Sequence, residues 1–223
     1  MVDSWLLIRW VFIAFLIVIL AFLIFTQIIL RIIRRYYKFP IPAIMTRLID
    51  NPIRRRFIQR PKVIAERMQL KPGMVVVEIG PGKGSYTKAV AERILPGGKV
   101  YAVDIQESVV KRLKSRVAQE GITNIIPMID NAHNFSFDTE SADRVVALSC
   151  LPEIPEQVKV LRECHRILKP DGLVCLCEVL IDPDYPRRKT VKRWADEAGL
   201  ELRHEFGNWF AYQLNFGKKH DED

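Results

Sequence analysis

The sequence predicts an α/β domain with a doubly wound, mostly parallel sheet of seven strands, preceded by one transmembrane helix. Three observations support this prediction. From residue 75 onward, short β-branched runs alternate with segments of helical periodicity, which is typical of parallel βαβ units. A glycine-rich turn follows the first of these runs. A long apolar stretch lies near the N-terminus.

The apolar stretch runs from Trp10 to Leu30 without a charged residue. At about 1.5 Å per residue it is long enough to span the roughly 30 Å hydrocarbon layer of a bilayer. It ends at Arg31 without the small residues of a cleavage site, so we expect a retained anchor and not a cleaved signal. The predicted organisation is an anchor in residues 1–35, a basic juxtamembrane segment in 36–62 and a folded domain in 63–223.

The formal net charge of +8 comes from one part of the chain. Residues 31–62 contain ten Lys or Arg and a single acid, Asp50, whereas the remaining charges nearly balance. The excess therefore predicts contacts of segment 31–62 with membrane lipids, and no nucleic-acid partner is expected. Basic residues beside a transmembrane helix favour the cytoplasmic side, which predicts a single-pass protein with its N-terminus outside and its domain in the cytoplasm.

Two short helices are expected within the basic segment. Apolar residues between Ile41 and Ile49 have amphipathic spacing, and this face either lies in the membrane interface or packs on the domain. Asn51-Pro52 is typical of a helix start. The helix that follows would carry Arg54, Arg55 and Arg56, for which we expect head-group contacts, with a substrate or cofactor role as the alternative.

The glycine-rich turn joins a strand to a helix. Val75 to Ile79 is a β-branched run too short for a helix, and Ser85 to Ile94 has helical spacing. Between them lies Gly80-Pro81-Gly82-Lys83-Gly84, where the glycines allow a sharp turn and a close approach of a ligand. The exposed N–H groups of the helix start favour a ligand with an anionic group.

A second strand, Lys99 to Asp104, also ends in an acid. A carboxylate about 20 residues beyond a glycine loop is where a nucleotide-binding βαβ unit holds the ribose hydroxyls. Asp104 is therefore a candidate ribose ligand, with Ile105 beside it in the site. The alternative is that Asp104 caps the next helix, residues 107–120.

The remaining elements continue the alternation. Strands are expected at 125–129, 144–148 and 173–179, and a helix at 156–168 is stopped by Lys169-Pro170-Asp171-Gly172. A helix at 187–198 and two strands at 200–205 and 210–216 close the domain. A short loop joins the last two strands, so they should pair antiparallel.

Residues 60–218 resemble the class I S-adenosylmethionine-dependent methyltransferases, especially the branch that includes quinone-biosynthesis and lipid methyltransferases. The resemblance rests on the order and spacing of four motifs: Glu78 to Gly84, Val103-Asp104, Asp130-Asn131-Ala132, and Leu161 to Gly172. It implies a Rossmann-like fold, with S-adenosylmethionine as cofactor.

The resemblance also implies roles for individual residues. Gly80, Gly82 and Gly84, with Pro81 between them, would wrap the methionine part, and Glu78 would hold its amino group. Asp104 would bind the ribose. Asp130, Asn131 and Ala132 would border the adenine, and Ser149 would lie near the methionine end. One departure is that residues 131–137 lack the family's common Leu-Pro-Phe.

No acid–base pair stands out, because a sulfonium methyl group is already activated and the enzyme mainly aligns the acceptor. His133 is a candidate general base, with a surface contact as the alternative. Glu153 is a candidate contact for a cationic acceptor. Cys150, Cys164, Cys175 and Cys177 lack the spacing of a zinc site, so no metal is expected.

These observations predict a membrane-anchored methyltransferase whose acceptor is a lipid head group or a quinone-like molecule. A protein or a soluble small molecule is the alternative acceptor. Two other classes use the same fold, a nicotinamide-dependent oxidoreductase and a non-catalytic membrane tether. Trp194, Trp209, Phe210 and Tyr212 either line an acceptor pocket or pack in the core.

Overall fold

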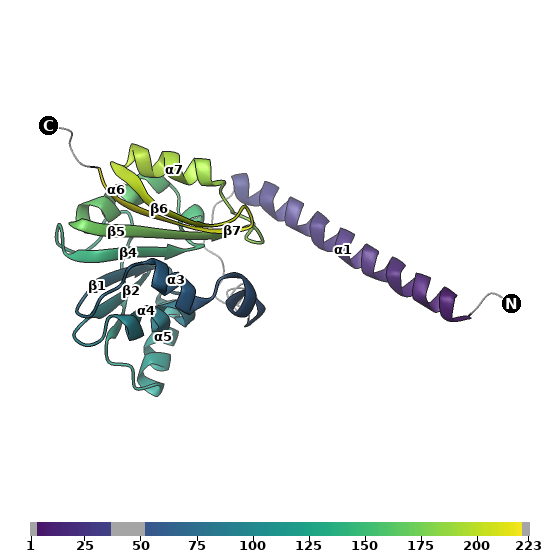
Figure 1. Cartoon of the computed structure of the whole chain (residues 1–223), viewed down its shortest axis with the longest axis horizontal. Coiled ribbons are helices and arrows are strands. Elements are labelled where there is room, and N and C mark those ends of the chain that lie inside the picture. Colours follow the sequence, from purple (N-terminus) through teal and green to yellow (C-terminus); the bar gives the residue numbers. More distant parts are fainter. Residues whose placement is uncertain (1–3, 37–51, 220–223) are drawn as a thin grey trace. The chain divides into compact units, whose positions relative to one another are not determined.

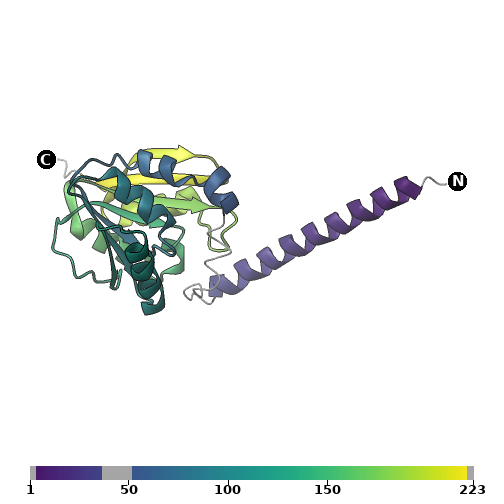
Figure 2. The ribbon, with the colours of Figure 1, turned by 90° about the horizontal axis from the view of Figure 1, so that it is seen from below.

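The computed structural model describes residues 4–36 and 52–219, which belong to two separate units. The first unit contains α1, Ser4–Tyr36, one uninterrupted helix (Figures 1 and 2). Its stretch Ile8–Arg34 is long and apolar enough to cross a membrane, a property that anchors share with signal sequences. The amphipathic helix expected between Ile41 and Ile49 lies outside the described residues.

The second unit contains a seven-stranded sheet in the order β3-β2-β1-β4-β5-β7-β6. Strand β7 runs antiparallel to both of its neighbours, and the other pairings are parallel. This arrangement confirms the predicted fold class (Figure 1). The strands are β1 Val75–Ile79, β2 Lys99–Asp104, β3 Ile125–Ile129, β4 Ala142–Leu148, β5 Leu168–Val179, β6 Leu200–Gly207 and β7 Ala211–Lys218.

Helices connect most of these strands at the expected places. They are η1 Arg54–Ile58, α3 Pro61–Arg67, α4 Ser85–Arg93, α5 Glu107–Gln119, η2 Leu151–Glu153, α6 Gln157–Ile167 and α7 Arg188–Glu197. Most boundaries agree with the prediction to within two residues, and the largest difference concerns β5, which begins at Leu168, directly after α6, and not at residue 173. Leu168 pairs with Ala142, and a register shift then separates this pair from the main ladder at Arg144 and Leu173.

The two faces of the sheet bury separate apolar layers. Alternate strand residues point to opposite faces, so Val76 packs with α3, α4 and α5, whereas Val77 packs with α6 and α7. Both sides of the central strands are therefore covered, which explains their continuous β-branched sequences.

Buried polar contacts fix α3 on the sheet. The Arg144 guanidinium donates to the backbone oxygens of Met68, at 2.7 Å, and Gln69, at 3.0 Å. The Asn215 side chain donates to the oxygen of Arg67 at 2.7 Å. Removing either buried donor would leave backbone oxygens without a hydrogen-bond partner. These contacts hold the end of α3, just before β1, on the sheet.

Candidate active site

The sheet order reverses between β1 and β4, which start the two halves of the domain. In open α/β sheets the crevice at the carboxyl ends of two such strands is the usual ligand site. Here β1 leads into Gly80 and β4 leads into Ser149 and Cys150. The two loops touch, since the Cys150 thiol donates to the Ile79 oxygen at 3.0 Å.

The glycine loop is shaped for a close backbone approach. Gly80 and Gly82 have φ values of +65° and +54°, which L side chains rarely adopt. A Cβ at Gly80 would lie 2.8 Å from the Cβ of Cys150, whereas a Cβ at Gly82 would meet nothing within 4 Å. The loop therefore packs closely against Cys150 at Gly80 and is open at Gly82. Pro81 contributes its backbone oxygen, which accepts from the N–H of Gly84 at 2.8 Å.

Glu78 is a buried carboxylic acid beneath this loop. Its side chain is 2% exposed, and its Oε2 atom has no hydrogen-bond partner among the described residues. Burial raises the pKa of Glu78 to about 7, and the nearby Thr87 hydroxyl offsets part of this shift. An unsatisfied buried acceptor calls for a ligand or an explanation. Its place fits the amino group that the resemblance assigns to it.

The end of β2 has the features expected for a ribose and an adjacent base. Burial raises the pKa of Asp104, an effect opposed by the N–H of Gln106 and by Arg112. Its Oδ1 accepts from the Gln106 N–H at 2.9 Å, so the carboxylate also orders the turn before α5. Ile105, beside it, is exposed although apolar.

The loop after β3 is held by its own side chains. The Asp130 carboxylate accepts from the Asn131 N–H, at 2.8 Å, and from the N–H and hydroxyl of Ser136, at 3.0 and 2.8 Å. Ala132 is buried. Asp130 therefore orders the loop that would border the adenine.

His133 connects this loop to the one after η2. Its Nε2 atom lies 2.8 Å from the Pro155 oxygen and its Nδ1 atom 3.2 Å from Oδ1 of Asn131. A nitrogen that donates to a carbonyl oxygen carries a proton and cannot accept one. These contacts favour the alternative interpretation, a contact between loops, over a general base.

Ser149 connects the site to η1, the helical segment that carries Arg54. It has a φ of +50°, an uncommon value for a non-glycine residue that is often found at functional sites. Its hydroxyl accepts from the Arg54 guanidinium at 2.7 Å, and Arg54 also donates to Gln59 at 2.7 Å. Arg54 is 4% exposed. The expectation that Arg54 contacts lipid head groups is therefore wrong, because its guanidinium is buried against the loop after β4.

Arg55 reaches the other side of the site. Its guanidinium donates to the Ser85 hydroxyl at 2.6 Å, at the start of α4. Positive charge there adds to the partial charge of the helix N-terminus and favours an anion. Arg56, by contrast, is exposed. The sequence predicts the same role for all three arginines. In the structure, Arg54 is buried, Arg55 contacts Ser85 and Arg56 is exposed.

An acidic cluster extends the site beyond β5. Glu178 is 1% exposed, and its Oε2 atom has no hydrogen-bond partner within the described parts of the chain. Burial raises the pKa of Glu178 well above its ordinary value; Asp182 raises it further, Arg54 opposes the shift, and Glu153 and Asp184 add to it. Carboxylates gathered in this way favour a cationic partner.

Three members of this cluster also have the spacing of metal ligands. Oxygen atoms of Glu153, Asp182 and Asp184 lie within 4.8 Å of one another, and hard cations prefer such oxygen ligands. The expected absence of a metal stays a prediction, and this cluster is where a metal would bind. The sequence could not reveal it, because η2 and the segment after β5 meet only in the fold.

Comparisons with known proteins agree with this geometry. Residues 76–172 match the family model of a methyltransferase domain. Demethylmenaquinone methyltransferase from Geobacillus stearothermophilus is 33% identical over 123 residues, which cover 55% of this chain and 53% of the relative. Ubiquinone/menaquinone biosynthesis C-methyltransferase UbiE from Hydrogenovibrio crunogenus is 34% identical over 110 residues, covering 49% and 43%. The chain thus spans about half the length of these relatives.

A solved structure extends the likeness over the whole fold. The SAM-dependent methyltransferase from Aquifex aeolicus superposes with a TM-score of 0.73 at 20% identity and covers 79% of this chain and 98% of its own. The matched segment 76–172 contains the glycine loop, Asp104 and the loop after β4. Together, the domain match, the two relatives and the solved structure support a class I S-adenosylmethionine-dependent methyltransferase.

Proposed function

We propose that the protein transfers a methyl group from S-adenosylmethionine to a membrane-confined acceptor, a lipid head group or a quinone-like molecule. The observation that carries the transfer is the cradle formed by the open Gly82 loop, the unsatisfied Glu78 oxygen and the Asp104 carboxylate. The two relatives, by their names, act on quinones. The apolar stretch of α1 and the basic residues 31–62 favour a membrane location, with the domain on the cytoplasmic side.

The residues present fit the cofactor at three points. Gly82 leaves room for its methionine part, and Glu78 would accept from its ammonium group. Asp104 would accept from the ribose hydroxyls. When bound, the cofactor supplies a methyl group on a positively charged sulfur. The protein then needs to orient the acceptor, exclude water and receive any proton that the acceptor loses.

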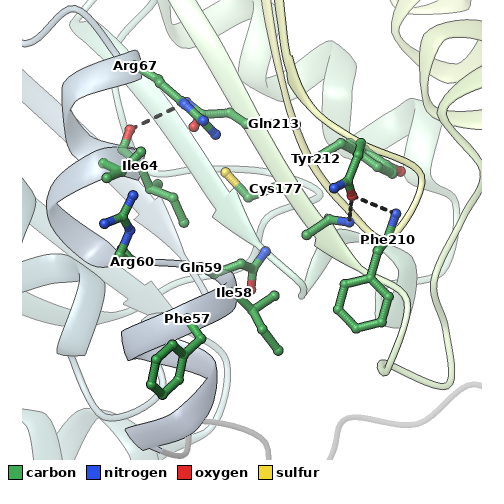
Figure 3. Close-up of a pocket in the computed structure, with 14 residues that line it drawn as sticks. Phe57, Ile58, Gln59, Arg60, Ile64, Arg67, Cys177, Phe210, Tyr212 and Gln213 are labelled. Atoms are coloured by element: carbon green, nitrogen blue, oxygen red, sulfur yellow. Dashed lines mark hydrogen bonds between the residues drawn. The ribbon is translucent and has the colours of Figure 1, made fainter.

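A groove beside this site offers room for an acceptor. It encloses about 290 Å³ between the segment formed by η1 and α3 and the β6–β7 hairpin (Figure 3). Phe57 and Phe210 contribute aromatic walls, and Cys177 and Gln59 lie toward the inner end. Such mixed apolar and polar lining suits a small molecule.

Direct hydrogen bonds connect the groove to the glycine-loop crevice. Gln59 accepts from Arg54, which in turn donates to Ser149. The N–H of Ser149 donates to the oxygen of Cys177 at 2.8 Å. Of the aromatic tail residues, Phe210 lines the groove, while Trp194 and the ring of Tyr212 pack in or against the core. The acceptor would therefore meet the cofactor near Ser149, with Glu178 and Glu153 on the same side.

Radiolabel transfer tests the acceptor. The full-length protein is incubated with methyl-labelled S-adenosylmethionine and host membranes, and lipid, protein and aqueous fractions are separated. We expect label in the lipid extract, and less label at subsaturating cofactor in a Gly82→Ala variant, in which the affinity for the cofactor should be lower. Label confined to protein or to water-soluble products would instead support the alternative acceptors.

Glu78 should make cofactor binding depend on pH. Below about pH 7 the buried acid is protonated in the free protein, whereas a bound ammonium group favours the carboxylate. We therefore expect the affinity for S-adenosylmethionine to rise between about pH 5 and 7 and then level off. In the free protein the folded state holds this proton up to about pH 7 and the unfolded chain only to about 4.5, so the contribution of Glu78 to stability falls across that interval.

Titration calorimetry in buffers of different ionisation enthalpy measures this linkage. At about pH 6 we expect close to one proton released per cofactor bound. A Glu78→Gln variant should bind more weakly and without the proton release. Proton uptake, or an affinity that is flat from pH 5 to 7 in the wild type, would contradict the assigned role of Glu78.

A further inference from the structure

Large apolar side chains are exposed around the outer end of the groove. Ile53, Phe57 and Trp209 are 68%, 76% and 73% exposed. Phe57 precedes α3, and Trp209 lies in the turn between β6 and β7. Phe57 and Phe210 line the same groove, and the rings of Trp209 and Phe210 meet edge to face with centroids 5.8 Å apart. The two segments, far apart in the sequence, therefore border one opening.

Figure 3 shows the direction in which these rings point. The rings of Phe57 and Phe210 lie at the outer end of the groove, away from Cys177 and Gln213. Ile53 precedes Phe57 by about one helical turn, which brings both to the same face of the helical segment. We call Ile53, Arg56, Phe57, Arg60 and Trp209 the groove rim.

Hydrogen bonds hold the rim in this exposed arrangement. Oδ1 of Asn208 accepts from the N–H groups of Phe210 and Ala211, at 2.9 and 3.1 Å. The Tyr185 hydroxyl donates to the oxygen of Trp209 at 2.6 Å. On the other side, buried Arg54 and Gln59 fix the helical segment that carries Phe57. The apolar side chains are thus presented outward on ordered backbone, at a cost in exposed apolar surface that a partner would remove.

The charges beside the rim indicate the chemistry of that partner. Arg56, Arg60 and Lys62 are exposed, and residues 52–65 contain no acid. Exposed aromatic rings beside arginines suit the head-group layer, where Trp prefers to lie and cations meet anionic lipids.

We propose that the groove rim docks on the anionic surface of a lipid bilayer, so that the groove opens toward the membrane. The proposal deepens the proposed function and rests on it, because a membrane-confined acceptor could then enter without crossing water. The covalent chain supports this occupant. Residues 37–51 join α1 to the domain and extend at most about 55 Å in any conformation. A domain tethered at that range needs only weak docking contacts to remain on the surface.

Fluorescence quenching by bromine-labelled lipid tests the contact directly. The full-length protein is reconstituted in vesicles of phosphatidylcholine alone or mixed with phosphatidylglycerol. Trp5, Trp10 and Trp194 are replaced by Phe, which leaves Trp209 as the only tryptophan. The matched control instead keeps Trp194, which packs against the core. We expect lipid bromines to quench Trp209 by at least about twofold in the anionic vesicles, less in the neutral ones, and Trp194 in neither.

Charge variants and an independent binding assay separate the possible outcomes. Arg56→Gln with Arg60→Gln should reduce the difference in Trp209 quenching between anionic and neutral vesicles, and an unchanged difference would contradict the role of these two arginines. An unquenched Trp209 in protein that floats with the vesicles would overturn the docking, and so would a dimer that covers Trp209. Cofactor binding, measured by calorimetry in detergent, tells the two proposals apart: quenching without cofactor binding would contradict the proposed function alone.

Discussion

Replacing Gly82 by Ala should lower the affinity for S-adenosylmethionine by at least about tenfold, the equivalent of roughly 1.4 kcal/mol. The added methyl group would meet no atom of residues 4–36 or 52–219 within 4 Å. It would instead occupy the open space above the loop, where the cofactor backbone is expected to lie. The loss should therefore appear in binding, with little change in packing. Equilibrium binding of the cofactor and urea unfolding measure the two effects separately.

Gly121→Ala is the matched control for this substitution. Gly121 has a φ of +64° and also has nothing within 4 Å of an added Cβ, but it lies in the turn between α5 and β3. Both variants should lose about 1 kcal/mol of unfolding free energy, because an L residue is strained at positive φ. Only Gly82→Ala should lose cofactor affinity. Equal affinities for the cofactor in the two variants would contradict the placement of Gly82 in the cofactor site.

Asp104→Asn should weaken cofactor binding by about a hundredfold. The amide oxygen can still accept from the Gln106 N–H, so the turn before α5 is kept. The negative charge and the second acceptor for the ribose hydroxyls are lost, and hydrogen bonds to a charged group contribute about 1.5–3 kcal/mol each. Calorimetry with the cofactor measures this change.

Asp143→Asn provides the comparison for Asp104. Asp143 accepts from the Val75 N–H at 2.8 Å and forms an ion pair with Lys169. It lies at the amino ends of β1 and β4, whereas the glycine loop follows the carboxyl end of β1. Its replacement should lower stability and leave the affinity unchanged. A drop in affinity as large as that of Asp104→Asn would mean that both act through general destabilisation.

Much of the fold follows from local sequence. The β-branched runs ending in Glu78-Ile79 and Asp104 predicted β1 and β2, since short runs bounded by turns have few alternatives. The short loop near Gly207-Asn208 predicted the antiparallel closing pair. The start of β5 at Leu168 was missed, because Pro170 and Gly172 suggest a turn, whereas the pairing of Leu168 with Ala142 depends on the neighbouring strand.

The site was less accessible to sequence reasoning. Glycines and acids at the ends of β1 and β2 could be placed, because both the motif and its position in the βαβ unit are local. The contact between Arg54 and Ser149 joins residues 95 positions apart, and nothing local distinguishes Arg54 from Arg56. Glu178 lies in the apolar run of β5, and an acid within such a run is a signal of a functional group that the sequence did offer.

The alternative classes make different use of the same crevice. A nicotinamide-dependent oxidoreductase would need the third glycine or an alanine of its fingerprint where Ser85 stands. In the structure, that serine hydroxyl accepts from Arg55. A non-catalytic tether would have no use for an unsatisfied, buried Glu78 beneath an open glycine loop. Both alternatives therefore predict weak or absent binding of S-adenosylmethionine.

Calorimetric titration of the full-length protein in detergent with S-adenosylmethionine, and separately with NADH, tests the central claim most directly. The claim predicts saturable binding of S-adenosylmethionine with proton release near pH 6, weaker binding in Gly82→Ala, and no binding of NADH. Binding of NADH alone, or of neither compound, would contradict it.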